Sequence, residues 1–462
     1  MAELDISAPR SMRRAGVFAT LLLIGFIGAF IYLGFTLVND SPEYMARSGA
    51  ASYGIVYDRS GDVLFDGTKP LSEYPAGQFA DIGNVIGDTS GQMANTLVAR
   101  NLTELANYSF LYGKGNGKTA LKCTLSHNAN KAVYKAFGKK NGTAIAYNWK
   151  TGEVLVCVSK PSVDPAAGYA NIAKLADGSL LCKAFLPTVP GSTQKVSTLL
   201  AAYETMGADA VNNLEFPCSG SWLNANGQRI NCHESKGHGK QKLAEAFANS
   251  CNPYFAQLVQ SDKLPLSRII ETYTRMGYSV NGADAAPLTC SNIRISPAST
   301  TLTDAKDFDT QWGCLGQGTT LVSPFQLMLW EGAIANQTGV AVLPTMLSEK
   351  TDVSGAVTLI SAPGKTAQMF TPEAAAAANA VMTENVKKHY TTIAKYKCGV
   401  KSGTAQISDG GKEYENSLLA GFSADDRCPV AFCILIEQHK KGDITTAQIA
   451  KTMLDKIAAL NE

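Results

Sequence analysis

The sequence predicts an α/β fold of the α+β sandwich type. Two apolar runs, residues 143–149 and 153–159, flank a short turn and read as a hairpin from the centre of a sheet. Three more strand-like runs lie near the end of the chain, at 398–407, 417–423 and 429–437. We expect the segment between the hairpin and these runs to be mostly helical. A sheet made from the early hairpin and the late strands, with helices inserted between them, gives such a sandwich.

Composition allows one large globular domain with smaller attachments. The 462 residues are 45% apolar and 17% charged, which excludes disorder as the default. Forty-one Lys and Arg residues face 39 Asp and Glu residues, so the net charge is +2. This balance indicates no nucleic acid or anionic surface as a partner.

The N-terminal region predicts a membrane anchor. Residues 17–38 are uncharged and apolar, close to the roughly 20 residues that cross a bilayer core. Three arginines precede this run and two acidic residues follow it, namely Arg10, Arg13, Arg14, Asp40 and Glu43. The positive-inside rule then keeps residues 1–16 cytoplasmic and exports the chain beyond residue 39. A cleaved signal peptide is the alternative, but its apolar core is usually only about 7 to 15 residues long.

The exported chain begins with a region that we interpret as a stalk, residues 39–118. It contains scattered Gly and polar residues without a strong period, and one short strand pair, Tyr53–Gly67, that turns at Ser60 and Gly61. The large domain follows, from residue 119 to residue 462.

Two helices of this domain can be predicted from their apolar patterns. Residues 196–206 are apolar on nearly every face, which indicates a helix buried in a core, and Gly207 is a fitting stop. The C-terminal run, residues 445–460, places Ile449, Met453 and Ile457 on one helical face.

Eleven cysteines are an odd number for an exported protein, so at least one is free or pairs with another molecule. Their spacing contains no C-x-x-C pair and few histidines lie nearby, so we expect no zinc site and no other metal. Cys218 and Cys232 flank a Gly, Ser and Asn-rich loop that a disulfide would close. Free thiols in a reducing or anoxic niche are an equal alternative.

The sharpest chemical feature is the S-x-x-K motif of Ser192 and Lys195. Pro190 and Gly191 end the preceding segment, so Ser192 starts a helix, where unpaired N–H groups favour a developing oxyanion. Lys195 lies on the same helical face, within reach of the hydroxyl. Burial and a second nearby cation would lower its pKa, as a general base requires. A helix cap followed by a surface lysine is the structural alternative.

A second motif, Ser250-Cys251-Asn252, follows a predicted helix. Ser250 and Asn252 can project into one cleft, where a hydroxyl relays the proton of the leaving group and an amide holds a substrate carbonyl. Alone, the segment is also compatible with a plain helix end, because Pro253 follows Asn252.

A third motif requires a choice between two sites. An exact K-T-G occurs at Lys150, in the turn of the early hairpin, and we assign it to a solvent-exposed tip. The variant K-S-G-T lies in a late strand-like run, where a strand edge can pair with extended substrate. There the lysine and the hydroxyls would bind a terminal carboxylate and the glycine would allow close approach, through Lys401, Ser402, Gly403 and Thr404.

S-x-x-K, S-x-N and K-S-G in this order resemble the motif set of the penicillin-recognising acyl-serine enzymes. More narrowly, the chain resembles a class B penicillin-binding protein. The segments GIVYDRSGDVL, TGEVLVCVSKPSVDP, GHGKQKLAEAFANSCNPYF and LGQGTTLVSPF are similar to that family. The resemblance implies a β-lactamase/transpeptidase-like fold, in which an antiparallel five-stranded sheet is flanked by helices. The chain departs from the family at Tyr53, where Arg is usual, and at Ser402, where Thr is commoner.

The resemblance also implies a function. Ser192 would attack the bond between two terminal D-alanines of a peptidoglycan stem peptide, and a second stem's amine would take the acyl group. Backbone N–H groups of Ser192 and Thr404 would form the oxyanion hole. Implied partners are stem peptides, β-lactam antibiotics, the cytoplasmic membrane and a polytopic glycan polymerase, with no cofactor. Rival functions are a serine β-lactamase, a β-lactam sensor and a non-catalytic scaffold of wall assembly.

Overall fold

A five-stranded antiparallel sheet forms the centre of the computed structural model, which describes residues 10–360, 364–409 and 411–460. Its strand order is β18-β19-β20-β6-β7. The predicted early hairpin and three late strands therefore do build one sheet. The bounds are β6 Gly142–Asn148, β7 Val154–Lys160, β18 Cys398–Asp409, β19 Lys412–Ser423 and β20 Val430–Ile436.

The hairpin position differs from the prediction in one respect. We expected both hairpin strands at the centre of the sheet, but β7 is an edge strand. It reads as central because its side chains are buried on both faces, where helix α5 (His127–Ala136) and a short 3-10 turn (Lys183–Phe185) pack against it. Burial by helices thus replaces burial by neighbouring strands.

Helices cover both faces of the central sheet, as a sandwich requires. Helices α5 and α14 (Thr446–Ala458) pack on one face with alternate residues of the strands. On the other face, α12 (Pro324–Ala335) packs against β6, β19 and β20, and α13 (Pro372–His389) packs against β18. Helix α6 (Lys195–Met206) packs against α13. The predicted buried face of α14 is confirmed, because Ile449, Met453 and Ile457 have no exposed surface.

The predicted buried helix is confirmed in α6. Every residue from Lys195 to Tyr203 is buried. The helix ends at Gly207, whose φ of 80° lies in the left-handed region that glycine adopts without strain.

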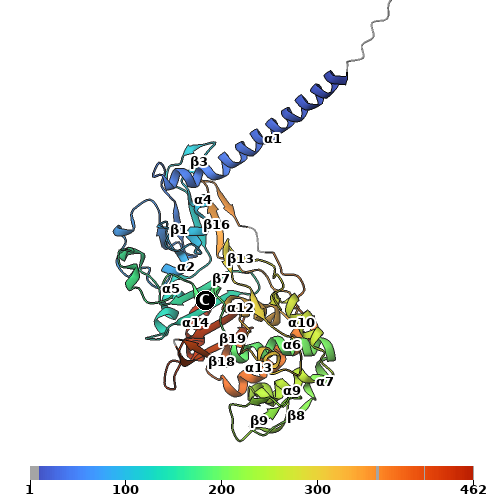
Figure 1. Cartoon of the computed structure of the whole chain (residues 1–462). Helices are drawn as coiled ribbons and strands as arrows, with labels where there is room; N and C mark the ends of the chain where they lie inside the picture. Colours follow the sequence, from blue (N-terminus) through green and yellow to red (C-terminus); the bar gives the residue numbers. More distant parts are fainter. Residues whose placement is uncertain (1–9, 361–363, 410, 461–462) are drawn as a thin grey trace, which may run out of the picture.

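A second sheet lies at the end of the molecule where α1 (Arg10–Arg47) joins it, with strand order β17-β16-β5-β1-β2 (Figure 1). Its β1–β2 pair is the predicted hairpin, with Val56 opposite Phe65. The other three strands come from the chain after residue 118, so this sheet joins residues from both sides of the predicted boundary. The boundary itself stays a prediction. The bounds are β1 Ile55–Tyr57, β2 Val63–Asp66, β5 Ala120–Cys123, β16 Leu347–Thr351 and β17 Val357–Leu359.

The remaining elements are short and mostly connect or cover the two sheets. The helices are α2 Gly83–Ile86, α3 Leu97–Arg100, α4 Leu102–Leu105, α7 Ala208–Asn212, α8 Leu243–Ala248, α9 Asn252–Gln260, α10 Leu266–Arg275 and α11 Phe308–Cys314. The strands are β3 Tyr108–Ser109, β4 Gly113–Lys114, β8 Glu215–Cys218, β9 Ser221–Leu223, β10 Arg229–Asn231, β11 Gly239–Lys242, β12 Tyr278–Val280, β13 Leu288–Cys290, β14 Ile293–Ile295 and β15 Ala298–Thr300.

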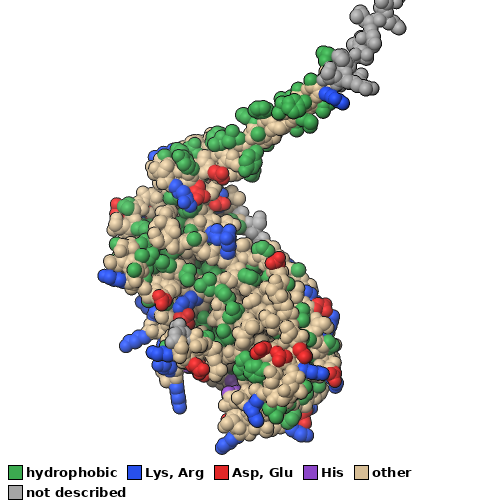
Figure 2. Space-filling model, viewed as in Figure 1, with side chains coloured by type: hydrophobic (Ala, Val, Ile, Leu, Met, Phe, Trp, Pro, Cys, Tyr) green, Lys and Arg blue, Asp and Glu red, His purple; other side chains and the backbone are tan. Residues whose placement is uncertain are grey.

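Helix α1 projects away from the globular part, and its projecting length is lined with apolar side chains (Figures 1 and 2). By length and composition it fits a membrane span, and its most apolar window is not buried by the protein. Residues 1–9 of the predicted tail lie outside the described residues. The helix does not stop at residue 38, because its last turns continue and bury Pro42 and Ala46 near α4 and β3.

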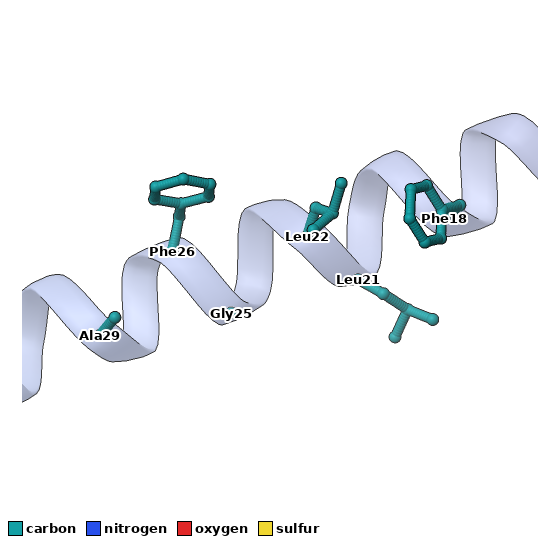
Figure 3. A pocket seen from close by; sticks show the side chains of 6 residues that line it. All are labelled: Phe18, Leu21, Leu22, Gly25, Phe26 and Ala29. Carbon is teal, nitrogen blue, oxygen red and sulfur yellow. The ribbon is translucent and has the colours of Figure 1, made fainter.

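One face of α1 is shallowly hollowed at Gly25 and Ala29 (Figure 3). Leu22 and Phe26 project from one side of the helix and Leu21 from the other. A ligand site needs a few polar groups to orient its ligand, and these apolar side chains offer none. The hollow is therefore part of the apolar surface of a helix that fits a membrane span.

The packing of α14 gives a stability prediction. Met453→Ala should lower the free energy of unfolding by about 2–5 kcal/mol, because it leaves a cavity between the helix and the sheet. Lys456→Ala, at an exposed position of the same helix, should change it by less than about 0.5 kcal/mol. Urea unfolding of the full chain in detergent, followed by tryptophan fluorescence, measures both. Equal midpoints for the two variants would contradict this packing.

Candidate active site

Ser192 lies in a single 3-10 turn, Gly191–Gln194, that leads directly into α6. Ser192 therefore lies at the start of a helical segment, as predicted, but its turn is a 3-10 turn, which is tighter than an α-helix. Gly191 has a φ of +54°, and a side chain there would meet the Thr404 carbonyl oxygen at 2.7 Å. Only glycine therefore lets strand β18 approach the serine so closely.

Lys195 lies one turn later and points back at the serine. Its Nζ is 2.9 Å from Ser192 Oγ, as the i+3 spacing predicted. The side chain has no exposed surface, and its amine lies 5.5 Å from the centre of the Phe255 ring. Burial lowers the pKa of Lys195 to about 7. Near neutral pH the amine is therefore available as a base.

The second motif surrounds the same amine. Ser250 and Asn252 lie at the junction between α8 and α9. Lys195 Nζ is 2.6 Å from the Ser250 carbonyl oxygen, 3.3 Å from Ser250 Oγ and 2.7 Å from Asn252 Oδ1. A neutral amine has two hydrogens and one lone pair. When the hydrogens are donated to the carbonyl and the amide oxygen, the lone pair is left for the hydroxyl proton of Ser192.

Ser250 has a φ of +51°, an unusual value for a residue with a side chain. Such a conformation costs about 1–3 kcal/mol and persists only where the surroundings impose it. Here it directs the carbonyl and the hydroxyl of one residue at the same lysine.

Lys401, on β18, approaches Ser250. Its Nζ lies 2.9 Å from Ser250 Oγ and 2.8 Å from the Ser402 carbonyl oxygen, and only 1% of the residue is exposed. Burial, with the nearby Lys195 amine as a second cause, holds the pKa of Lys401 well below its ordinary value. The side chain thus faces Ser250 from inside the protein.

Successive side chains of a strand point to opposite faces, so the residues after Lys401 alternate between two sides of β18. Ser402 and Thr404 line the open cleft, whereas Gly403 faces the Ser192 turn. A side chain at Gly403 would lie 2.6 Å from the Pro190 carbonyl oxygen and 3.1 Å from the Ser192 backbone nitrogen. This packing brings the backbone of β18 beside the serine.

The cleft in front of Ser192 has a volume of about 730 Å³. It contains residues that motif analysis did not identify, because they belong to no motif of fixed spacing. Gln317 Nε2 donates to the Thr404 carbonyl oxygen at 3.3 Å, and Asn252 Nδ2 donates to the Asn231 carbonyl oxygen at 3.1 Å. Gln317 lies in the segment LGQGTTLVSPF, and Ala248 and Asn249 lie in GHGKQKLAEAFANSCNPYF, so the resemblance of these segments to the family was the available signal. The additional lining residues are Asn231, Cys232, His233, Ala248, Asn249, Trp312, Gln317, Gln406 and Glu415.

The exact K-T-G at Lys150 and the cysteine pair Cys218 and Cys232 were also singled out in the sequence. Lys150 is exposed at the turn between β6 and β7, where it pairs with Asp426 at 3.0 Å, so the exact K-T-G is a hairpin tip as expected. The predicted disulfide between Cys218 and Cys232 is wrong for this structure, because all eleven cysteines are free thiols in the described part of the chain.

Two curated proteins are similar to this chain over most of its length. Stage V sporulation protein D of Bacillus subtilis is 28% identical over 318 residues, which cover 65% of this chain and 46% of that protein. Peptidoglycan D,D-transpeptidase MrdA of Acinetobacter baumannii is 22% identical over 363 residues, covering 72% of this chain and 53% of that protein. The chain therefore spans about half the length of these curated relatives.

Solved structures show the same fold. A ceftriaxone acyl-enzyme complex of penicillin-binding protein A from Mycobacterium tuberculosis matches with a TM-score of 0.74 and 17% identity, over 89% of this chain and 98% of that one. The D,D-transpeptidase domain of a peptidoglycan glycosyltransferase from Eggerthella lenta matches with a TM-score of 0.72 and 20% identity, also over 89% and 98%.

The family match covers the central sheet and all three motifs. Residues 142–455, more than half of the chain, match the family described as the penicillin binding protein transpeptidase domain. With the order of its motifs and its relatives, the chain belongs to this family and is a class B penicillin-binding protein.

Proposed function

We propose that the chain is a peptidoglycan D,D-transpeptidase that works through an acyl-enzyme on Ser192 and is inhibited covalently by β-lactams. The observation that carries the proposal is the buried Lys195 amine, 2.9 Å from the Ser192 hydroxyl and hydrogen-bonded to the second motif. Nucleophile, base and orienting groups thus form one chain of contacts. The proposal is supported by one relative that is named a peptidoglycan D,D-transpeptidase. It is also supported by a solved structure of the same fold that is an acyl-enzyme complex with ceftriaxone.

In the acylation step, Ser192 Oγ bonds to the carbonyl carbon between the two D-alanines while Lys195 takes the hydroxyl proton. The carbonyl oxygen becomes an oxyanion, which the N–H groups of Ser192 and Thr404 would stabilise. When the C–N bond breaks, Ser250 Oγ passes a proton to the departing amine and regains one from a neighbouring lysine. D-alanine leaves, and the peptide remains on Ser192 as an ester.

In the transfer step, the amine of a second stem attacks the ester carbon and loses a proton to Lys195. The Ser192–carbon bond breaks, Ser192 regains its proton, and the two stems are joined. The free edge of β18 supports an extended substrate, because β18 pairs with β19 alone among the described strands. The hydroxyls of Ser402 and Thr404 would bind the terminal carboxylate, with Lys401 behind them. Asn252 would hold a substrate carbonyl.

Other functions use the same acyl-serine chemistry. A serine β-lactamase hydrolyses its acyl-enzyme quickly, whereas a sensor keeps it and a scaffold forms none. The projecting α1 favours a membrane-attached wall enzyme over a secreted β-lactamase. A bilayer, and a polytopic glycan polymerase as partner, complete the proposal.

Labelling with a fluorescent penicillin tests the proposed nucleophile. The purified full chain should form one adduct, and peptide mapping should place it on Ser192. Ser192→Ala should abolish the adduct, and Lys195→Ala should slow its formation by about 10² to 10⁴, the usual contribution of general-base catalysis. Lys150→Ala, at the hairpin tip, is the matched lysine control and should label normally. A folded wild-type chain that takes no label would point to the scaffold.

The lifetime of the adduct separates the remaining functions. A half-life of many minutes is expected for a transpeptidase, and turnover within seconds would make the chain a β-lactamase. Cross-linking of paired stem peptides then distinguishes a transpeptidase from a sensor.

The depressed pKa of Lys195 predicts the pH dependence of acylation. Lys195 must be neutral to accept the proton, so the rate should be low at pH 6, half-maximal near the pKa of about 7, and level above pH 8. Stopped-flow labelling between pH 6 and 9, with circular dichroism as a control for folding, measures this. A rate that still rises tenfold per pH unit at pH 9 would show a lysine with its ordinary pKa.

The orientation of α1 can be tested in cells. Protease added to intact spheroplasts should degrade the chain beyond residue 39, because the arginines before the span keep the N-terminus inside. A cytoplasmic protein that becomes sensitive only after lysis is the control. Full protection of the large domain in sealed spheroplasts would reverse the orientation.

A further inference from the structure

Four potential metal ligands meet beside the catalytic lysine. Cys218 ends β8, Cys232 follows β10, His238 precedes β11, and Cys251 precedes α9. One ligand atom from each lies within 4.8 Å of all the others. No other group of three or more such residues was found in the described part of the chain.

The spacing of the ligand atoms fits a tetrahedral zinc ion. Zinc binds thiolate sulfur at about 2.3 Å and imidazole nitrogen at about 2.0–2.1 Å, so a tetrahedron places sulfur and nitrogen about 3.5 Å apart. Cys232 Sγ lies 3.5 Å from His238 Nδ1. The upper limit of 4.8 Å leaves only small shifts for the other pairs, whose sulfur-to-sulfur edge would be about 3.8 Å.

The chemistry of the four groups selects the same ion. Three thiolates and one imidazole form a Cys₃His set, which is typical of structural zinc sites and leaves no open position. Cys218 and Cys251 are buried, whereas Cys232 and His238 are partly buried, so the ion has a route of entry. His233 is the nearest alternative ligand, but its Nδ1 lies 3.9 Å from Cys232 Sγ on the exposed side.

We propose that Cys218, Cys232, His238 and Cys251 bind one zinc ion that fixes the second motif against the 215–242 segment. Cys251 lies between Ser250 and Asn252 in the chain, and both of these contact Lys195. The ion would not touch the reacting atoms. Its ligands are positioning residues that hold the turn on which the lysine's hydrogen bonds depend.

Two observations connect the cluster to that turn. Asn252 Nδ2 donates to the carbonyl oxygen of Asn231, the residue before Cys232. Ser250, the residue before Cys251, keeps its unusual φ of +51°. A zinc–sulfur bond on Cys251 would stabilise this conformation, and its loss would allow the turn to relax away from Lys195.

The cluster argues against the expectation that the chain has no zinc site. That expectation relied on the absence of short cysteine spacings, but here 13, 5 and 12 residues separate successive ligands. Two β-strand pairs, β8 with β11 and β9 with β10, fold the segment so that these distant residues meet. The loop that suggested a disulfide closes through a metal instead.

Metal analysis of the full chain tests the site without using its activity. The chain, purified in detergent under reducing conditions and without a polyhistidine tag, should hold about one zinc per molecule. Cys218→Ala and Cys232→Ala should hold almost none. Two matched controls should keep the zinc: Cys157→Ala, from a buried cysteine pair elsewhere, and His233→Ala.

Cobalt substitution adds a spectroscopic signature. Cobalt in the proposed site should give thiolate charge-transfer bands and the intense visible bands of a tetrahedral ion, and Cys232→Ala should remove them. Octahedral cobalt spectra would overturn the proposal. So would a wild-type chain that stays free of zinc after incubation with the ion, or one with a disulfide between two of the four ligands.

The effect on labelling rests on the proposed function, whereas metal content does not, so the two can fail separately. Removal of zinc by a chelator should slow penicillin labelling about tenfold to a hundredfold, because small displacements of catalytic groups are costly. Added zinc should restore the rate and added magnesium should not. A zinc-free chain with native circular dichroism and an unchanged labelling rate would overturn the positioning role.

Discussion

The hydrogen bonds around the buried amine of Lys195 are the constraint on which the rest of the site depends. Removing an ammonium group from water costs several kcal/mol unless the charge is compensated, and among the described residues no carboxylate is a partner of this amine. The lysine therefore gives up its proton more readily, as its lowered pKa indicates. Three separate segments supply its surroundings, so the candidate active site forms only when α6, the α8–α9 junction and β18 are packed together.

Glycine makes this packing possible where backbones approach most closely. Gly191 and Gly403 bring the serine turn and β18 together, and Gly316 presses against the same turn from the other side, where a side chain would lie 1.9 Å from the Gly191 carbonyl oxygen. The Gly191 N–H donates to the Gly316 carbonyl oxygen at 2.8 Å. These close contacts explain why glycine stands at positions 191, 316 and 403.

Local sequence patterns predicted the parts of the fold that local physics determines. The strand-like runs of β18, β19 and β20, the buried α6 and the apolar face of α14 each carry their own signal. The edge position of β7 was missed because helices bury it as fully as strands would. The burial of Lys401 behind Ser402, and the cysteine cluster, arise from tertiary contacts that no short spacing encodes.

The unbroken course of α1 has a mechanical consequence. The residues after 38 continue as helix to Arg47 and pack onto α4 and β3, so a stiff strut of about 13 Å, rather than a loose tether, joins the apolar span to the body. With the span in a bilayer, the mouth of the cleft would keep a nearly constant height and tilt above the lipid surface. Under the proposed function, the polymer within reach would then be confined to a thin layer, and access would depend on lateral diffusion more than on swinging of the body.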